Sequence, residues 1–341
     1  MNTPTVKDLP PPPTGKQGWP WAVGCPILPQ FSPLGLPWPK ISIVTPNYNY
    51  GCFLEELIRS VLLQGYPNLE YIVIDDGSTD NSLDIIRKYE RWLTYWETGK
   101  NCGQAAALNK GFLKTTGDIF AYNDSDNVYM EGCFESIGSL YAKGYEFILG
   151  RILFIDQEGN KLDTLSDCSY LQDFSQFIKF WSNCFYPSQA VFVSRKILKQ
   201  AFPLEEWLYY HFDYQLWLRA LAQNPKSIFI DKPLAKYRYH SGTKSINFSA
   251  QSKVQEIVMV AMGEEYRLSS KWKRIIFHLY ARDWHLLKLI MCSPMSWQPK
   301  DYFREAMKRP TILRWPLFWK MLLKSCIGEK KHASLRSFLR L

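Results

Sequence analysis

The sequence has no run of eighteen or more apolar residues and no charged-then-apolar segment of the kind that forms a secretory signal peptide. We therefore expect neither export nor a membrane-spanning helix, and a cytoplasmic location. Its eight cysteines include no Cys-x-x-Cys pair and no regular spacing, which argues against a zinc or disulfide framework. They are expected to be small buried apolar residues in a reducing compartment.

The first 39 residues have little that could form a helix or a central strand. Eleven of the 21 prolines lie within the first forty residues, and Trp19, Trp21 and Trp38 are interleaved with them. We predict an extended leader over 1–39 that is mobile up to about Gly15 and held against the folded body by its tryptophans.

The C-terminal region has few acidic residues. From Arg267 to Leu341 there are 17 Lys and Arg but only 4 Asp and Glu, so the net charge of +9 comes from this region. Residues 251–341 are predicted to be a basic helical extension suited to an anionic membrane surface, which would make the protein peripheral at the inner face of the cell membrane. Packing on the rest of the chain is an equally good interpretation of the first of these helices, whereas aromatics that alternate with aliphatic residues disfavour a nucleic-acid partner.

The middle of the chain alternates strands with helices, and its length allows one large or two modest domains. The predicted elements are a strand at 41–45, a loop at 46–51, a helix at 53–63, a strand at 70–74, a helix at 82–89 and a strand at 119–122. This order predicts an α/β fold with a doubly wound, mostly parallel sheet, which binds its ligands at the carboxyl ends of the strands.

Carboxylates follow two of these strands. Asp124 and Asp126 follow the strand at 119–122, where they could hold Mg²⁺ or Mn²⁺ and, through it, phosphate. An isolated Asp-Ser-Asp is more often a turn. Asp75 and Asp76 follow the strand at 70–74, where a carboxylate can accept hydrogen bonds from a ribose or a base, or simply form a turn before a helix.

Four segments in order resemble the family 2 glycosyltransferases, which have the GT-A fold. They are Ser42-Ile43-Val44-Thr45-Pro46-Asn47-Tyr48-Asn49, Ile74-Asp75-Asp76-Gly77-Ser78-Thr79-Asp80, Asn101-x-Gly-Gln-x-x-Ala-x-Asn109-x-Gly111 and Asp124-Ser125-Asp126. The resemblance covers roughly Lys40 to Ser245. It implies a GT-A domain at 40–250, with a nucleotide-sugar half at 40–130 and an acceptor half at 131–250.

The resemblance also implies roles in donor binding. A nucleotide diphosphate sugar would lie against Pro46, Tyr48, Asp75, Asp76, Gln104, Asn109 and Asp124, and Asp124 and Asp126 would hold the divalent cation. The family often has another acidic residue where this chain has Asn127, so Asp126 is the strongest predicted metal ligand, followed by Asp124.

The acceptor half is predicted to contain a strand at 147–155, a turn at 157–160 and a helix at 174–180. Pro187-Ser188-Gln189 is similar to a family segment beside the donor sugar, so the resemblance implies that Gln189 lies in the donor-binding site. The alternative is that Gln189 is an ordinary amide at the edge of a strand. Asp213 precedes Leu216-Trp217 as the family's general base does, whereas an acidic residue at a helix start is usually a cap. Neighbouring positions offer no second carboxylate.

The segment at 237–245 contains basic residues and a glycine. The resemblance implies that His240 completes the metal site or contacts the diphosphate, and that Arg238 or Lys244 holds phosphate. A packed or surface histidine is an equally good interpretation of His240.

We therefore expect a metal-dependent, inverting glycosyltransferase that acts on a glycan or lipid-linked acceptor in cell-surface polysaccharide or glycolipid synthesis. Inversion needs a base for the acceptor hydroxyl and a cation for the departing diphosphate. Two alternatives stay open: transfer to a polyprenyl phosphate, which needs no base, and a non-catalytic protein that binds sugar nucleotides or glycans.

Overall fold

The computed structural model describes residues 3–165, 188–244 and 299–308, together with six single positions in the C-terminal part. The chain forms two compact units. One comprises Met1–Phe177 and Asn183–Asn247, and the other comprises Ile178–Ser182 and Phe248–Leu341. The candidate site lies in the first unit.

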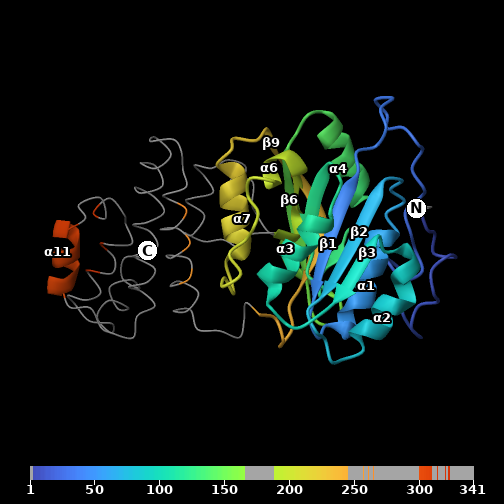
Figure 1. The fold of residues 1–341 in the computed structure, drawn as a ribbon, viewed down its shortest axis with the longest axis horizontal. Helices are drawn as coiled ribbons and strands as arrows, with labels where there is room; N and C mark the ends of the chain where they lie inside the picture. The colour runs from blue at the N-terminus through green and yellow to red at the C-terminus, as the bar shows by residue number, and fades with distance from the viewer. Residues whose placement is uncertain are drawn as a thin grey trace. The chain divides into compact units, whose positions relative to one another are not determined.

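Parallel strands form one half of the sheet in the first unit (Figure 1). Their order is β3 (Tyr95–Thr98), β2 (Leu69–Asp75), β1 (Ile41–Asn47) and β4 (Ile119–Tyr122). Because all four run the same way, the residues that follow β1, β2 and β4 meet at one edge of the sheet. The predicted doubly wound α/β sheet is confirmed.

The other half of the sheet mixes directions. Beyond β4 the order continues through β8 (Val191–Ser194), β6 (Phe147–Ile155), β9 (Ser227–Arg238) and β5 (Val128–Tyr129), and β7 (Lys161–Leu165) pairs with β6. Among the described strands of this half, only β6 and β9 pair in parallel. The antiparallel strand β8 brings η4 (Ser188–Ala190), the short 3₁₀ turn before it, beside the end of β4.

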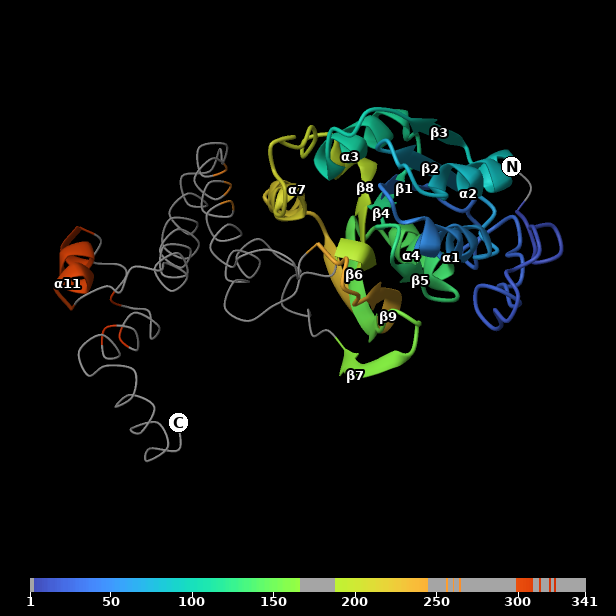
Figure 2. The ribbon, with the colours of Figure 1, turned by 90° about the horizontal axis from the view of Figure 1, so that it is seen from below.

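Helices cover both faces of this sheet (Figure 2). One core combines α1 (Gly51–Leu62), α2 (Ser82–Tyr89) and α4 (Cys133–Ala142) with the Ile41 and Ile43 face of β1. On the opposite face lie α3 (Gln104–Lys114) and α7 (Phe212–Leu221), whose Trp217 stacks on Tyr122 of β4. The described part of the first unit also contains two shorter helices, η1 (Glu90–Trp92) and α6 (Arg195–Leu198).

Gly111 explains how closely α3 approaches the sheet. A Cβ atom at this position would lie 2.4 Å from Cγ1 of Val44 and 3.3 Å from Cγ1 of Ile74. Only a residue without a side chain fits there, so Gly111 lets α3 pack closely on β1 and β2.

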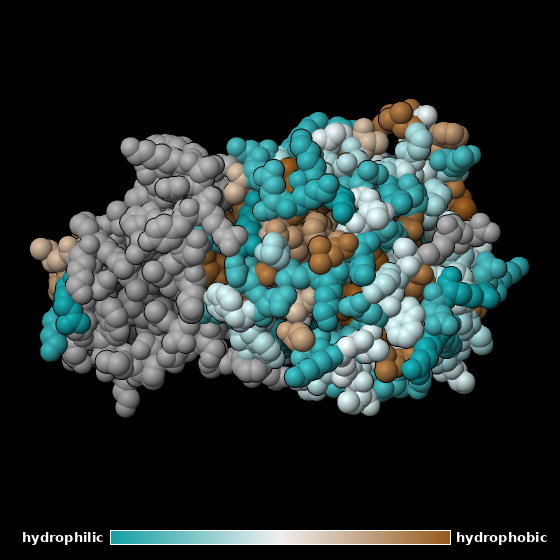
Figure 3. All heavy atoms as spheres, in the orientation of Figure 1, coloured by the Kyte–Doolittle hydropathy of each residue, from teal (hydrophilic) through white to brown (hydrophobic). Residues whose placement is uncertain are grey.

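The contacts between the leader and the rest of the first unit begin closer to the N-terminus than predicted. Leu9 is buried, and the buried Arg59 of α1 donates hydrogen bonds to the carbonyls of Pro10, Pro20 and Trp21. Expected mobility up to Gly15 therefore does not match these contacts. Further along the leader, Ile27, Phe31, Leu34 and Leu36 stay about half exposed, and Figure 3 shows apolar surface at the end of the domain where the leader runs.

The second unit is described in part. Its helix α11 (Pro299–Lys308) is amphipathic, with Tyr302 buried and Phe303 and Met307 exposed. Within the described residues no helix is both long enough and apolar enough to span a bilayer. The predicted helix at 174–180 and nearly all of the basic segments proposed for a membrane surface lie outside the described residues.

Candidate functional site

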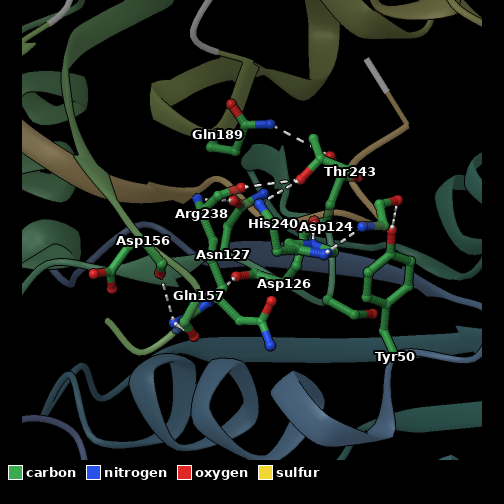
Figure 4. A network of polar contacts seen from close by, with 12 residues as sticks. Tyr50, Asp124, Asp126, Asn127, Asp156, Gln157, Gln189, Arg238, His240 and Thr243 are labelled. Atoms are coloured by element: carbon green, nitrogen blue, oxygen red, sulfur yellow. Dashed lines mark hydrogen bonds and ion pairs between the residues drawn. The ribbon is translucent and has the colours of Figure 1, made fainter. Parts of the chain in front are cut away.

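The site lies where β1, β2 and β4 end, and η4, the start of α7 and the segment after β9 complete it. Figure 4 shows the part of it around Asp124, Asp126 and His240. Asp124, Asp126, Gln189 and His240 come together here, although more than 100 residues separate Asp124 from His240.

Asp75 is buried and its carboxylate is used within the protein. It accepts hydrogen bonds from Asn47 Nδ2 (2.8 Å), Thr98 Oγ1 (2.7 Å) and both the backbone N–H and the hydroxyl of Ser78. These contacts join the ends of β1, β2 and β3. They favour a structural role for Asp75 rather than direct contact with a ligand.

Asp76 links the end of β2 to the start of α3. Its carboxylate accepts the backbone N–H of Gly103 at 2.7 Å and that of Cys102 at 2.9 Å. A carboxylate oxygen has room for more than one hydrogen bond, so Asp76 can still accept one from a nucleoside. Pro46 is buried nearby in β1, and Tyr48 exposes 44% of its surface.

Asp124 is held by two side-chain amides. Gln104 Nε2 donates to Oδ1 at 2.6 Å, and Gln189 Nε2 donates to Oδ2 at 3.3 Å. Burial, followed by the charge of Asp126, raises the pKa of Asp124 to about 7. Both carboxylate oxygens are thus occupied by protein donors.

Asp126 differs from Asp124 in having a free oxygen. Its Oδ2 lies 3.1 Å from His240 Nε2, while its buried Oδ1 has no hydrogen-bond partner in the described part of the chain. The backbone N–H of Gly242 donates to His240 Nδ1, so the proton of a neutral ring lies on Nε2 and is donated to Asp126. An unpaired buried carboxylate oxygen beside an imidazole is suited to a divalent cation.

Aromatic side chains enclose His240. The ring centre of Phe53 lies 4.8 Å from that of the imidazole, and Tyr50 meets it edge-on at 5.5 Å. The Tyr50 hydroxyl donates to the carbonyl of Gly242 at 2.9 Å, which holds the loop after β9 against the start of α1.

Arg238 is almost wholly buried behind Asp126. Its guanidinium donates to the carbonyls of Asp126 (2.9 Å) and Gln157 (2.9 Å) and pairs with Glu56 at 2.8 Å. These contacts fix the peptide that carries Asp126 (Figure 4). They indicate a positioning role, in place of the phosphate contact predicted for Arg238.

Lys244 faces the carboxylates from the end of the same loop. Its ammonium donates to Gln104 Oε1 at 3.2 Å and lies 3.8 Å from the centre of the Tyr209 ring. The positive charge of Lys244 lowers the pKa of both Asp124 and Asp213, against the stronger effect of burial. The Lys244 ammonium thus acts on two acidic residues from different parts of the fold.

Asp213 lies in the first turn of α7, after the N-cap residue His211, where the helix dipole favours a negative charge. Its Oδ2 accepts the hydroxyl of Ser188 at 2.9 Å and its Oδ1 accepts the N–H of Tyr214 at 2.7 Å. Burial raises the pKa of Asp213, while the charge of His211 and these hydrogen bonds lower it.

Comparison with known proteins gives the family. The model of the family described as Glycosyl transferase family 2 matches residues 42–202. An uncharacterized glycosyltransferase of Haemophilus influenzae is 31% identical over 195 residues, which cover 56% of this chain and 75% of that protein. The chain belongs to glycosyltransferase family 2.

A second relative of this glycosyltransferase is the putative teichuronic acid biosynthesis glycosyltransferase TuaG of Bacillus subtilis. It is 32% identical over 131 residues, or 37% of this chain and 51% of TuaG. The structure of S. aureus TarS 1-349 in complex with UDP-GlcNAc aligns with a TM-score of 0.59 and 17% identity, covering 85% of this chain and 82% of that TarS 1-349 chain. The shared fold is GT-A, as expected.

The predicted residues of the glycosyltransferase do not all meet. Asn109 hydrogen-bonds the backbone of Leu204 and the carboxylate of Glu206, and none of its described contacts is to Asp124 or Asp126. Within the described residues, no three His, Cys, Asp or Glu side chains are arranged to hold a metal ion, so the predicted set of Asp124, Asp126 and His240 does not form a three-ligand cluster.

Sequence reasoning missed Ser188, Tyr50 and Glu56. Ser188 contacts Asp213, Tyr50 holds the His240 loop, and Glu56 pairs with Arg238. Each acts on a residue from a distant segment, and periodicity within one segment carries no signal for such a contact.

Proposed function

We propose that this glycosyltransferase moves a sugar from a nucleoside diphosphate sugar to an acceptor hydroxyl with inversion. Asp213 would act as the general base, and Asp126 with His240 would hold a divalent cation. One observation carries the proposal: the consecutive residues Ser188 and Gln189 of η4 hydrogen-bond Asp213 at 2.9 Å and Asp124 at 3.3 Å. The proposed base, Asp213, can therefore lie on the opposite side of one site from Asp124 and Asp126, where the donor diphosphate would bind.

On the donor side, Pro46, Tyr48 and Asp76 are proposed to receive the nucleoside. The partly exposed ring of Tyr48 offers a flat apolar surface, and Asp76 offers a carboxylate already fixed by the N–H groups of Cys102 and Gly103. TarS was solved with UDP-GlcNAc, which makes UDP the first nucleotide to test.

Asp126 and His240 suit Mn²⁺ or Mg²⁺ because one carboxylate oxygen is free and an imidazole nitrogen lies beside it. Coordination through Nε2 would require the imidazole proton to move to Nδ1 and the hydrogen bond from the N–H of Gly242 to Nδ1 to break. With two protein ligands, the diphosphate and water would supply the remaining oxygens. When bound, the cation would neutralise the charge that develops on the departing diphosphate.

Asp213 would take the proton of the acceptor hydroxyl as that oxygen attacks the anomeric carbon. The carboxylate is held at both oxygens by Ser188 and Tyr214 and needs no large movement to keep its orientation. Lys244 would help to keep the neighbouring acids ionised or to receive phosphate, since its ammonium lies among them.

The acceptor is proposed to be a cell-surface polysaccharide or a lipid-linked precursor. TuaG, whose name places it in teichuronic acid biosynthesis, supports this acceptor class. An acceptor phosphate would need no base, so transfer to a polyprenyl phosphate predicts a different response to the loss of Asp213.

The test for the base is Asp213→Asn, with the exposed Asp84→Asn as the matched control. A set of nucleotide sugars is first screened for hydrolysis or transfer with and without Mn²⁺. We expect Asp213→Asn to lose at least about a hundredfold in kcat, because a positioned base contributes that much, and Asp84→Asn to keep the wild-type rate. Near-normal turnover by a folded Asp213→Asn variant would instead favour a phosphate acceptor.

The test for the cation is calorimetry with UDP. Mn²⁺ should tighten UDP binding to the wild type and to Asp84→Asn, and it should have little effect on Asp126→Asn. Binding that is equally tight with and without Mn²⁺ in the wild-type protein would remove the proposed metal role.

A further inference from the structure

Ser188 lies at the centre of a short chain of hydrogen bonds that ends on the proposed base. It is the first residue of η4, its surface is 2% exposed, and it directly precedes Gln189. Trp217 Nε1 donates to Ser188 Oγ at 3.0 Å, and Ser188 Oγ donates to Asp213 Oδ2 at 2.9 Å.

The direction of these two hydrogen bonds follows from the chemistry of the groups. An indole N–H can only donate, and an ionised carboxylate can only accept. The Ser188 hydroxyl therefore accepts from Trp217 and directs its own proton toward Asp213. No other assignment satisfies both contacts while Asp213 is ionised.

Trp217 itself has little freedom to move. Its side chain is fully buried, stacks on Tyr122 with ring centres 6.1 Å apart and planes at 10°, and meets Phe147 edge-on at 6.0 Å. The chain of hydrogen bonds thus starts from an indole held by β4 and β6 and ends on the first turn of α7, four residues before Trp217 itself.

We propose that Trp217 and Ser188 are positioning residues for Asp213, holding its carboxylate in one orientation and stabilising its ionised form. The catalytic consequence rests on the proposed function, in which Asp213 is the base. The hydrogen bonds and their effect on the carboxylate do not depend on that function.

A base in this place needs such support because burial favours its neutral, protonated form. Burial raises the pKa of Asp213, and the groups around it act against that effect. The charged and polar groups that face it are His211, Ser188, the N–H of Tyr214, Lys244 and, with the opposite effect, Asp124. Ser188 is the one side chain of this set that hydrogen-bonds the carboxylate directly in the contacts described.

The test follows the carboxyl group of Asp213 by NMR in the full chain labelled with ¹³C-aspartate, without any substrate. The Asp213 signal is assigned by its loss in Asp213→Asn. Ser188→Ala should raise the pKa of Asp213 by about one unit or more, because it removes a hydrogen bond to the charged form. Ser188→Cys should give a smaller rise, since a thiol is a weaker donor of similar shape.

Ser194→Ala is the matched control. Ser194 is a buried serine at the end of β8, six residues after Ser188, and it hydrogen-bonds Tyr141 rather than Asp213. It should leave the Asp213 titration unchanged. Trp217→Phe should raise the pKa of Asp213 by less than Ser188→Ala does, because the hydroxyl remains but is free to turn.

The kinetic counterpart uses the donor that the nucleotide-sugar screen identifies. Ser188→Ala should move the acid limb of the kcat profile to higher pH by the same amount as the NMR titration, with the donor KM unchanged. The proposal is overturned if Ser188→Ala shifts the pKa of Asp213 by less than about 0.3 unit. Loss of activity in Asp213→Asn with no shift in Ser188→Ala would reject the positioning role and keep the base.

Discussion

Replacement of Arg238 by methionine separates two roles that this residue could have. The guanidinium donates to the carbonyls of Asp126, Asp156 and Gln157 and pairs with Glu56, whose side chain is 15% exposed. Methionine fills similar space but leaves Glu56 as an unpaired, mostly buried charge. Removing one partner of a buried ion pair costs roughly 3–5 kcal/mol, so we expect a loss of about 4 kcal/mol in the free energy of unfolding.

In a domain of this size, about 4 kcal/mol lowers the melting temperature by roughly 8–16 °C, which scanning calorimetry measures. The peptide of Asp126 would also lose its donor, so the gain in UDP affinity that Mn²⁺ produces should shrink in the folded variant. Arg219→Met is the matched control: Arg219 is a buried arginine that donates to the carbonyls of Ala201 and Pro203, away from Asp126. It should lower stability and leave the Mn²⁺ effect intact.

The reasoning is refuted if Arg238→Met unfolds within about 1 kcal/mol of the wild type, because the four contacts would then contribute nothing measurable. A loss of UDP affinity in the absence of metal would instead support the phosphate contact that the resemblance implies for Arg238. This affinity is measured at a temperature where Arg238→Met is fully folded.

Three other substitutions probe the fold and its charges. Arg59→Met should cost about 3 kcal/mol and speed trypsin cleavage after Lys16, because three leader carbonyls lose their donor; Arg87→Met, at an exposed ion pair, should do neither. Asp213→Asn should make the protein more stable than the wild type near neutral pH but not below the ordinary carboxyl pKa. Because burial raises the pKa of Asp213 in the folded state, the stability of the wild type falls as pH rises above the ordinary carboxyl pKa. Urea unfolding at several pH values measures this, and an Asp213→Asn variant that is no more stable than the wild type near neutral pH would contradict the prediction. Gly111→Ala should lose about 1–3 kcal/mol by forcing a methyl group against Val44, and an unchanged urea midpoint would show that α3 can move away.

Local pattern was sufficient for much of the fold. The apolar run at 119–122, the helix at 82–89 and the strand at 147–155 have the predicted bounds, because burial on a sheet and amphipathic spacing are properties of each segment alone. The antiparallel strand β8 was not predicted. Its direction depends on how the acceptor half folds back against β4, which periodicity in the segment does not encode.

The candidate site was predictable to the level of residue type but not of contact. Asn127 makes Asp126 a stronger predicted metal ligand than Asp124, and the free oxygen of Asp126 is consistent with that prediction. The spacing does not distinguish Asp75 from Asp76 beside it. Only the structure shows that the Asp75 carboxylate already accepts hydrogen bonds from Asn47, Ser78 and Thr98. The roles of Arg238 and Asn109 depend on partners 80 or more residues away, which a single sequence does not pair.

The leader also bears on where this protein can be cut. The family match begins at residue 42, yet Arg59 donates to carbonyls of residues 10, 20 and 21, and Trp19 donates to the carbonyl of Tyr129. A version trimmed to the matched region would remove these three carbonyl acceptors of Arg59, leave Tyr89 as the remaining partner among these contacts, and strip cover from the core beneath Leu9 and Trp38. For expression or transplantation, the smallest useful unit therefore starts near the N-terminus, well before the first strand of the recognised domain.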